Sequence, residues 1–169
     1  MENQTQFFQP FRWWYAVIIF VTANIISALP AGLNGNEFIY NSFQQPNVAP
    51  PDWLFPPMWL FLNITSLIAL YIVANSPKQL PQKRIFLVLE MFGWVLFAIF
   101  TTLYFGLNSP ILGAIDTVTG LIVAIASLIC CYSISRTASI LISLRALWLT
   151  LASYVSVYVA FNNLDPLFQ

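Results

Sequence analysis

Five long stretches of mostly apolar residues, separated by short polar breaks, dominate the sequence. They cover residues 13–29, 53–74, 85–106, 111–133 and 140–161. Each is close to the roughly 20 residues that a helix needs to cross a bilayer. The breaks carry turn-forming residues, as in Pro30-Ala31-Gly32 and Asn108-Ser109-Pro110. The pattern therefore predicts an all-α membrane protein: one domain over residues 1–169, built as a bundle of five transmembrane helices with a long loop over residues 30–52.

Composition supports this class. The chain is 59% hydrophobic and 7% charged, and it contains no histidine. Such a composition excludes a disordered chain and argues against a soluble domain. Six basic residues balance six acidic ones, so nothing indicates a nucleic-acid partner, and the lipid bilayer is the expected environment.

The basic residues predict how the chain is oriented. With five spans, the N-terminus, the second loop and the fourth loop lie on one side, and they hold Arg12, Lys78, Lys83, Arg84 and Arg136. The opposite side holds acidic residues and no lysine or arginine. Because positively charged loops stay in the cytoplasm, the N-terminus is predicted to be cytoplasmic, and the loop over residues 30–52 and the C-terminus to lie outside. The identity of the membrane stays open.

A proline- and aromatic-rich stretch precedes the second span. Pro50-Pro51 holds the chain extended, since proline fixes φ and restricts the residue before it. The helix then begins either with Asp52 as its N-cap or later, with Pro56-Pro57 in its first turn. The tryptophans Trp53 and Trp59 are interfacial anchors in one interpretation and the aromatic rim of a ligand cavity in another.

Three ionisable residues fall inside the spans, where charges are costly and often functional. Glu90 and Arg145 lie at similar depth toward the cytoplasmic side. They can form a structural ion pair, or Arg145 can extend toward the interface. Asp116 has no basic residue at its depth, so it either lines a polar cavity or is a neutral acid in the core.

Small residues in the fourth span recur three or four positions apart. They form a seam that allows another helix to approach closely, within the bundle or across a homodimer. Its members are Gly113, Thr117, Gly120, Ala124, Ser127 and Cys131. The sequence offers no histidine base, glycine-rich phosphate loop or cluster of metal ligands. We therefore predict no catalytic residue, no metal and no cofactor.

The entrance to the second span resembles the signature of one family. The pattern Pro-x-x-x-Pro-Pro-x-Trp-x-Phe-x-x-x-Trp is complete from Pro46 to Trp59. It is typical of the translocator protein family, also called tryptophan-rich sensory protein or peripheral-type benzodiazepine receptor. Further matches to the family are Tyr104-Phe105-Gly106, Pro110, Asp116, Trp148, Ala152 and Asn163.

The resemblance implies a five-helix bundle whose outer half encloses a cavity, with the first loop as its lid. Such a pocket suits porphyrins, haem precursors and sterols, because aromatic walls stack on flat ligands. The wall residues carried over from the family are Pro51, Phe55, Trp59, Asp116, Trp148 and Ala152. Phe97 and Thr101 occupy wall positions with changed chemistry.

Other departures from the family alter the pocket's polarity. Asn63 stands where the family has a tyrosine. Arg145 is the second residue of a pair that reads Pro-Tyr in the family. The resemblance implies a membrane binding protein or sensor for porphyrin-like tetrapyrroles or sterol-like lipids. Two alternatives stay open: a transporter of such ligands, and light-dependent porphyrin degradation that uses Trp59 and Trp148.

Overall fold

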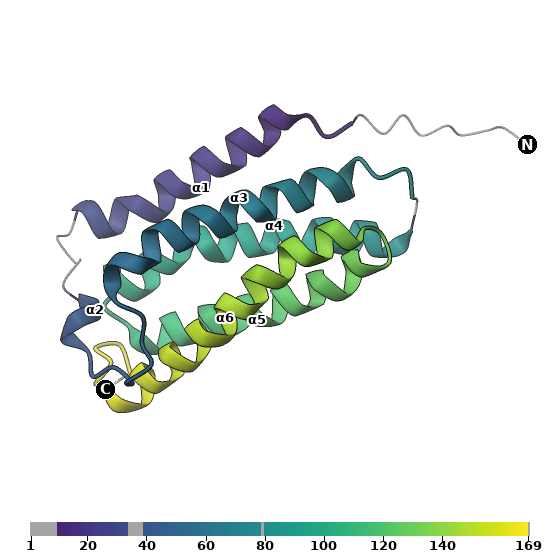
Figure 1. The fold of residues 1–169 in the computed structure, drawn as a ribbon. Helices are drawn as coiled ribbons and strands as arrows, with labels where there is room; N and C mark the ends of the chain where they lie inside the picture. Colours follow the sequence, from purple (N-terminus) through teal and green to yellow (C-terminus); the bar gives the residue numbers. More distant parts are fainter. Residues whose placement is uncertain (1–9, 34–38, 79, 169) are drawn as a thin grey trace, which may run out of the picture.

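The structure is a computed structural model that describes residues 10–33, 39–78 and 80–168. Over these residues the chain is helical and forms no strand. Five long helices run side by side, and α1 begins at the end of the bundle opposite to the one at which α6 finishes (Figure 1). They are α1 (Trp13–Leu33), α3 (Phe55–Ala74), α4 (Pro81–Thr101), α5 (Pro110–Tyr132) and α6 (Arg136–Asn162). Each contains a span long and apolar enough to cross a membrane, which confirms the predicted all-α membrane class.

Three helix boundaries differ from those predicted by about one helical turn. The first is the start of α4, which lies at Pro81 and not at residue 85. Helix α1 continues to Leu33, so Pro30 lies within its last turns and not in a turn. The proline removes only one backbone donor there, and a membrane helix tolerates that loss. Helix α6 begins at Arg136, where the side chain of Ser135 accepts a hydrogen bond from the N–H of Ala138 (3.3 Å). The hydrophobic pattern did not indicate this start, because the first turn of α6 is polar.

The proline-rich entrance combines the two predicted starts. A single 3₁₀ turn, η2 (Asp52–Leu54), precedes α3, which begins at Phe55 with Pro56 in its first turn. Asp52 is not the N-cap of α3. Its carboxylate instead accepts hydrogen bonds from the N–H of Trp53 (2.7 Å) and from Asn41 Nδ2 (2.8 Å). Asn41 belongs to the short helix α2 (Ile39–Ser42), so Asp52 ties the first loop to the entrance.

The connection from α4 to α5 is tightly held. Helix α4 ends in a wider π-helical turn, η3 (Thr102–Gly106), and the chain then reverses at Asn108, whose φ of 52° lies in the left-handed region that asparagine tolerates. Ser109 caps α5 by accepting from the N–H of Leu112 (3.2 Å). The C-terminal Asp165 accepts from Ser109 Oγ (2.6 Å) and from the N–H of Ile111 (2.9 Å).

The seam of small residues is used inside the bundle. Helices α5 and α6 pack along most of their lengths, and α4 covers another side of α5. A Cβ on Gly113 would overlap the ring of Tyr104, and one on Gly120 would lie 3.8 Å from Leu149 Cδ1. The seam therefore brings α5 close to η3 and α6 within one chain, which is the first of the two uses predicted for it.

Hydrogen bonds between loops define the two ends of the bundle. At one end, Lys78 Nζ donates to the carbonyls of Ser133 and Ile134 (3.0 Å each). At the other end, Gln44 and Asn163 exchange two hydrogen bonds, of 2.8 and 3.2 Å, between the first loop and the C-terminal segment. The loop that carries α2 therefore covers the end at which α6 finishes.

Candidate functional site

A cavity of about 670 Å³ lies among the five long helices, toward the end covered by α2. Most of its wall is aromatic or aliphatic, with a few polar side chains between. Helices α3 to α6 form the walls, α1 adds Asn24, Ser27 and Ala28, and the first loop adds Tyr40 and Pro50. The volume falls within the range of small-molecule sites, about 300–1,000 Å³.

Seven of the eight wall residues predicted from the resemblance lie on this cavity. They are Phe55, Trp59, Phe97, Thr101, Asp116, Trp148 and Ala152. The eighth, Pro51, is not among the described lining residues, and its neighbour Pro50 lines the cavity instead. The carbonyl of Pro50 accepts a hydrogen bond from Tyr40 Oη (2.8 Å), so the extended Pro50-Pro51 segment presents Pro50 to the interior.

The aromatic wall is a chain of ring contacts between elements far apart in sequence. The Tyr40 ring packs against Phe55 with centroids 5.1 Å apart, and Phe55 packs edge-on against Trp148 at 5.7 Å. Farther along α3, Trp59 contacts Phe97 at 5.4 Å. These are ordinary geometries for aromatic pairs. The first loop, α3, α4 and α6 are thereby held together around the cavity.

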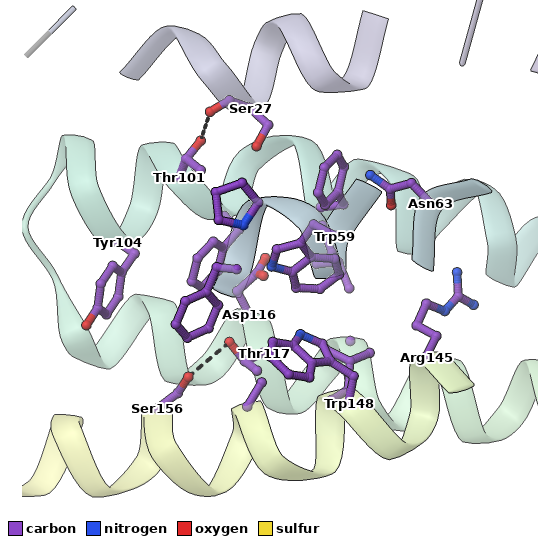
Figure 2. A pocket seen from close by; sticks show the side chains of 18 of the residues that line it. Ser27, Trp59, Asn63, Thr101, Tyr104, Asp116, Thr117, Arg145, Trp148 and Ser156 are labelled. Atoms are coloured by element: carbon purple, nitrogen blue, oxygen red, sulfur yellow. Dashed lines mark hydrogen bonds between the residues drawn. The ribbon is translucent and has the colours of Figure 1, made fainter. Parts of the chain in front are cut away.

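Several buried polar atoms of the wall have no hydrogen-bond partner. Among the described residues they are Asn63 Nδ2, Trp94 Nε1, Asp116 Oδ1 and Trp148 Nε1. Asn63, Asp116 and Trp148 are 5%, 7% and 9% exposed. Figure 2 shows these three residues on different helices around one space, with the indole nitrogen of Trp148 facing it. Because a buried polar atom costs free energy when unpaired, such a set is typical of a site completed by a ligand.

An ion pair adjoins the inner end of the cavity, farthest from the first loop. Arg145 lines the cavity, and its guanidinium pairs with both carboxylate oxygens of Glu90. Arg145 Nη1 also donates to Ser66 Oγ (2.9 Å), and Ser66 Oγ donates to Glu90 Oε2 (2.8 Å). Of the two roles predicted for Arg145, the structure shows the structural ion pair. Asp116 lies on the cavity wall, as the first of its two interpretations predicts.

Hydroxyl groups complete the polar part of the wall. Ser156 Oγ donates to Thr117 Oγ1 (3.3 Å), which in turn donates to the carbonyl of Gly113 (2.7 Å). In Figure 2 this pair lies next to Asp116, between the α5 and α6 ribbons. The hydroxyls are thus already engaged with the protein, whereas Asp116 Oδ1 is not.

Some lining residues were missed by sequence reasoning. Trp94 lies three residues before Phe97, and Phe97 lies four before Thr101, so helical spacing along α4 would have placed Trp94 on the same face. Asn24 and Ser27 are polar residues in an otherwise apolar span, and that contrast could have marked the inward face of α1.

Sequence comparison identifies relatives of this chain. Residues 9–161 match the TspO/MBR family. The chain belongs to this family. It is 30% identical to the tryptophan-rich protein TspO of Chlorobaculum tepidum over 135 residues, which are 76% of this chain and 85% of the relative. It is 28% identical to the tryptophan-rich protein TspO of Archaeoglobus fulgidus over 153 residues, which are 86% of this chain and 98% of the relative. The resemblance inferred from the signature is thus confirmed.

Proposed function

We propose that this TspO/MBR family member binds a flat, largely apolar small molecule within the membrane and acts as a sensor or regulator. The observation that supports this most is the combination of an aromatic wall with buried polar atoms that lack a partner. The aromatic faces supply stacking area, and the polar atoms orient the ligand. A bundle that only oligomerised would need neither a cavity of about 670 Å³ nor the loop that covers it.

Porphyrin-like tetrapyrroles and sterol-like lipids are the ligand classes that fit this description. Both are flat and apolar and reach the protein through the bilayer. The aromatic rings of the pairs Phe55–Trp148 and Trp59–Phe97 line the cavity and supply faces on which a planar ring system can stack. Direct ring contacts contribute beyond the area they bury.

Tryptophan fluorescence quenching by protoporphyrin IX in detergent tests this proposal. We expect saturable quenching of the wild-type protein, with an affinity severalfold weaker in Trp148→Phe and in Asp116→Ala. Trp14→Phe is the matched control, because Trp14 lies near the start of α1 and not on the cavity. Quenching that rises linearly, with the same slope in every variant, would argue for a bundle without a ligand.

We also propose that the end of the bundle holding Lys78 and Arg136 faces the cytoplasm, which places α2 and the cavity mouth outside. The charge difference between the two ends supports this orientation. A chain with Cys130 and Cys131 replaced by alanine allows a direct test. In intact cells, a membrane-impermeant maleimide should label Phe168→Cys and spare Lys78→Cys, and the reverse pattern would invert the topology.

A further inference from the structure

The guanidinium of Arg145 has donors that its ion pair does not use. An arginine side chain carries five N–H groups, two on each terminal nitrogen and one on Nε. Arg145 Nη1 donates to Glu90 Oε2 (3.0 Å) and to Ser66 Oγ (2.9 Å), and Nη2 donates to Glu90 Oε1. Among the residues that the structure describes, the Nε–H and the second N–H of Nη2 have no partner. Because the group is planar, these two N–H groups point the same way along one edge and form a second fork.

The cavity reaches Arg145 but not its partner. Arg145 is among the lining residues, and its side chain is 11% exposed, whereas Glu90 does not line the cavity and its side chain is 0% exposed. Gly93 also lines the cavity, and a Cβ built there would lie 3.8 Å from Arg145 Nη1. Gly93 therefore lies next to the guanidinium without a side chain that could cover it. The edge of the guanidinium that points away from Glu90 is the part that a ligand can reach.

Two further donors lie at the same end of the cavity. Asn63 is three residues before Ser66, so it lies one turn nearer the first loop on the same face of α3. It is 5% exposed and lines the cavity, and its Nδ2 has no hydrogen-bond partner. The indole N–H of Trp148, one turn beyond Arg145 on α6, is also unpaired. Figure 2 shows Asn63 and Arg145 toward one end of the cavity, on different helices. Donors gathered in this way need an acceptor from the ligand.

A carboxylate is the acceptor that fits this arrangement best. Its two oxygens match two parallel N–H groups of an arginine, and such charge-assisted hydrogen bonds are about twice as strong as neutral ones. We propose that the second fork of Arg145, assisted by the amide of Asn63, anchors a carboxylate of the ligand at the inner end of the cavity. This anchor presupposes the proposed binding function and adds a ligand class to it: a flat apolar molecule with an acidic group at one end. At both positions the chain departs from the family pattern, so the anchor is a feature of this member.

The charges at this end allow a carboxylate to bind in spite of Glu90. A carboxylate in the second fork touches the guanidinium, whereas Glu90 lies on another edge of it. The attraction to Arg145 therefore acts over a shorter distance than the repulsion from Glu90 and exceeds it. Asp116 adds no second repulsion. It is buried and has no basic partner among the described residues, a setting that favours the neutral acid.

Protoporphyrin IX and its dimethyl ester form a matched pair of probes, because the ester lacks the ionisable carboxyl groups. Each is titrated into purified protein in detergent at about pH 8, where free carboxylic acids are ionised. Binding is followed by the change in the ligand's absorption band. The measured quantity is the ratio of the dissociation constant of the ester to that of the acid. Partitioning of each probe into detergent is the same for every variant, so a change in this ratio reports the site.

Arg145→Lys removes the second fork and keeps the positive charge that Glu90 needs, so the bundle should still fold. We expect the acid to bind about tenfold more weakly and the ester about twofold, since the ester loses only a neutral hydrogen bond. The ratio should therefore fall about fivefold. Asn63→Leu, which removes the amide at similar volume, should lower the ratio about threefold. Arg136→Lys is the matched control, because Arg136 is exposed in the first turn of the same helix and does not line the cavity. Its ratio should equal that of the wild type.

Glu90→Gln should change the ratio in the opposite direction. It removes the competing negative charge and keeps a hydrogen-bonding side chain beside Arg145, so the acid should bind severalfold more tightly. Damage to the fold would weaken binding, so a purely structural role of the ion pair does not produce this gain.

The outcomes separate the anchor from the binding function on which it rests. If both probes bind saturably but the ratio is the same in the wild type, Arg145→Lys and Asn63→Leu, the anchor is wrong and the binding function stands. If neither probe binds to the wild type, the proposed function fails and the anchor fails with it. Should the variants of the ion pair not fold, Asn63→Leu decides, because Asn63 is not part of that pair.

Discussion

The guanidinium of Arg145 on α6 pairs with the carboxylate of Glu90 on α4, and both lie within the membrane-spanning part of the bundle. Buried pairs of this kind recover by attraction about what they lose in desolvation, so their net contribution to stability is small. Removing only one of the two residues is strongly destabilising, because an uncompensated charge then remains inside the protein.

We therefore expect a single substitution in the pair to destabilise the protein more than the double substitution does. Arg145→Met should destabilise the protein by about 3–5 kcal/mol, because Glu90 loses its partner. The double variant Glu90→Leu with Arg145→Met should melt close to the wild type, since both charges are gone. Thermal unfolding of the three proteins in one detergent measures this. A double variant less stable than Arg145→Met would show that the pair itself supplies net stability.

Gly113 and Gly120 offer a matched pair of substitutions on one helix. A Cβ at Gly113 would overlap the ring of Tyr104 in η3, whereas a Cβ at Gly120 meets Leu149 at an ordinary contact distance of 3.8 Å. Gly113→Ala should therefore cost about 1–3 kcal/mol from overpacking. Gly120→Ala should be neutral or stabilising, since alanine favours the helix by up to about 1 kcal/mol. Equal melting temperatures for the two variants would contradict this.

The number and class of the helices were predictable from the sequence because a bilayer demands about 20 apolar residues in each span. The ends of the helices were harder to predict from the sequence. The first turn of α6 is polar and is held by Ser135, and α1 passes through Pro30, so local composition at both places resembled a loop. Such ends depend on hydrogen bonds that hydropathy does not record.

The cavity was only partly predictable. The family signature located Trp59, and the polar character of Asp116 marked it within an apolar span. Helical spacing places Trp94 on the same face of α4 as Phe97, but which face of a helix points inward is decided by packing, so the sequence alone could not assign that face to a cavity. Equally, the sequence permitted an ion pair between Glu90 and Arg145, and only the fold shows that Ser66 completes it.

Asp165 should make stability depend on pH in the acid range. Burial alone would raise the pKa of this carboxyl. Hydrogen bonds from Ser109 and from the backbone N–H groups of Ile111, Leu167 and Phe168 outweigh burial and hold the pKa below its ordinary value. The folded state thus binds the proton more weakly than the unfolded state. The stabilisation is complete above the unfolded pKa of about 3.9 and is lost as the pH falls through the lower folded value.

Asp165→Asn should remove this part of the pH dependence and lower the melting temperature at pH 7. The difference between the variant and the wild type should shrink as the pH falls below about 3.9, because the wild-type carboxyl then becomes protonated as well. Asp52→Asn, at an exposed carboxyl of the same end of the bundle, serves as the control. Melting curves from pH 3 to pH 7 test this. Parallel curves for Asp165→Asn and the wild type would exclude Asp165 as the titrating group.

Tyr40 connects the first loop to the cavity wall. Its hydroxyl donates to the carbonyl of Pro50 (2.8 Å), and its ring lies against Phe55. Burial, together with the negative charge of Asp52, raises the pKa of Tyr40 to about 12, so the phenol remains a donor throughout the neutral range. Removing the hydroxyl should weaken the closure of the loop, while the ring, which lines the cavity, keeps its contact with Phe55.

Tyr40→Phe should therefore release a bound porphyrin about fivefold faster, the effect of one hydrogen bond worth about 1 kcal/mol. The association rate should change less, because the aromatic contacts with Phe55 are kept. Tyr132→Phe is the matched control, since Tyr132 is exposed at the other end of the bundle. Stopped-flow dissociation into excess lipid vesicles measures the release rate of each variant. Equal rates for Tyr40→Phe and Tyr132→Phe would mean that the loop does not retain the ligand, and that release proceeds between the helices directly into the membrane.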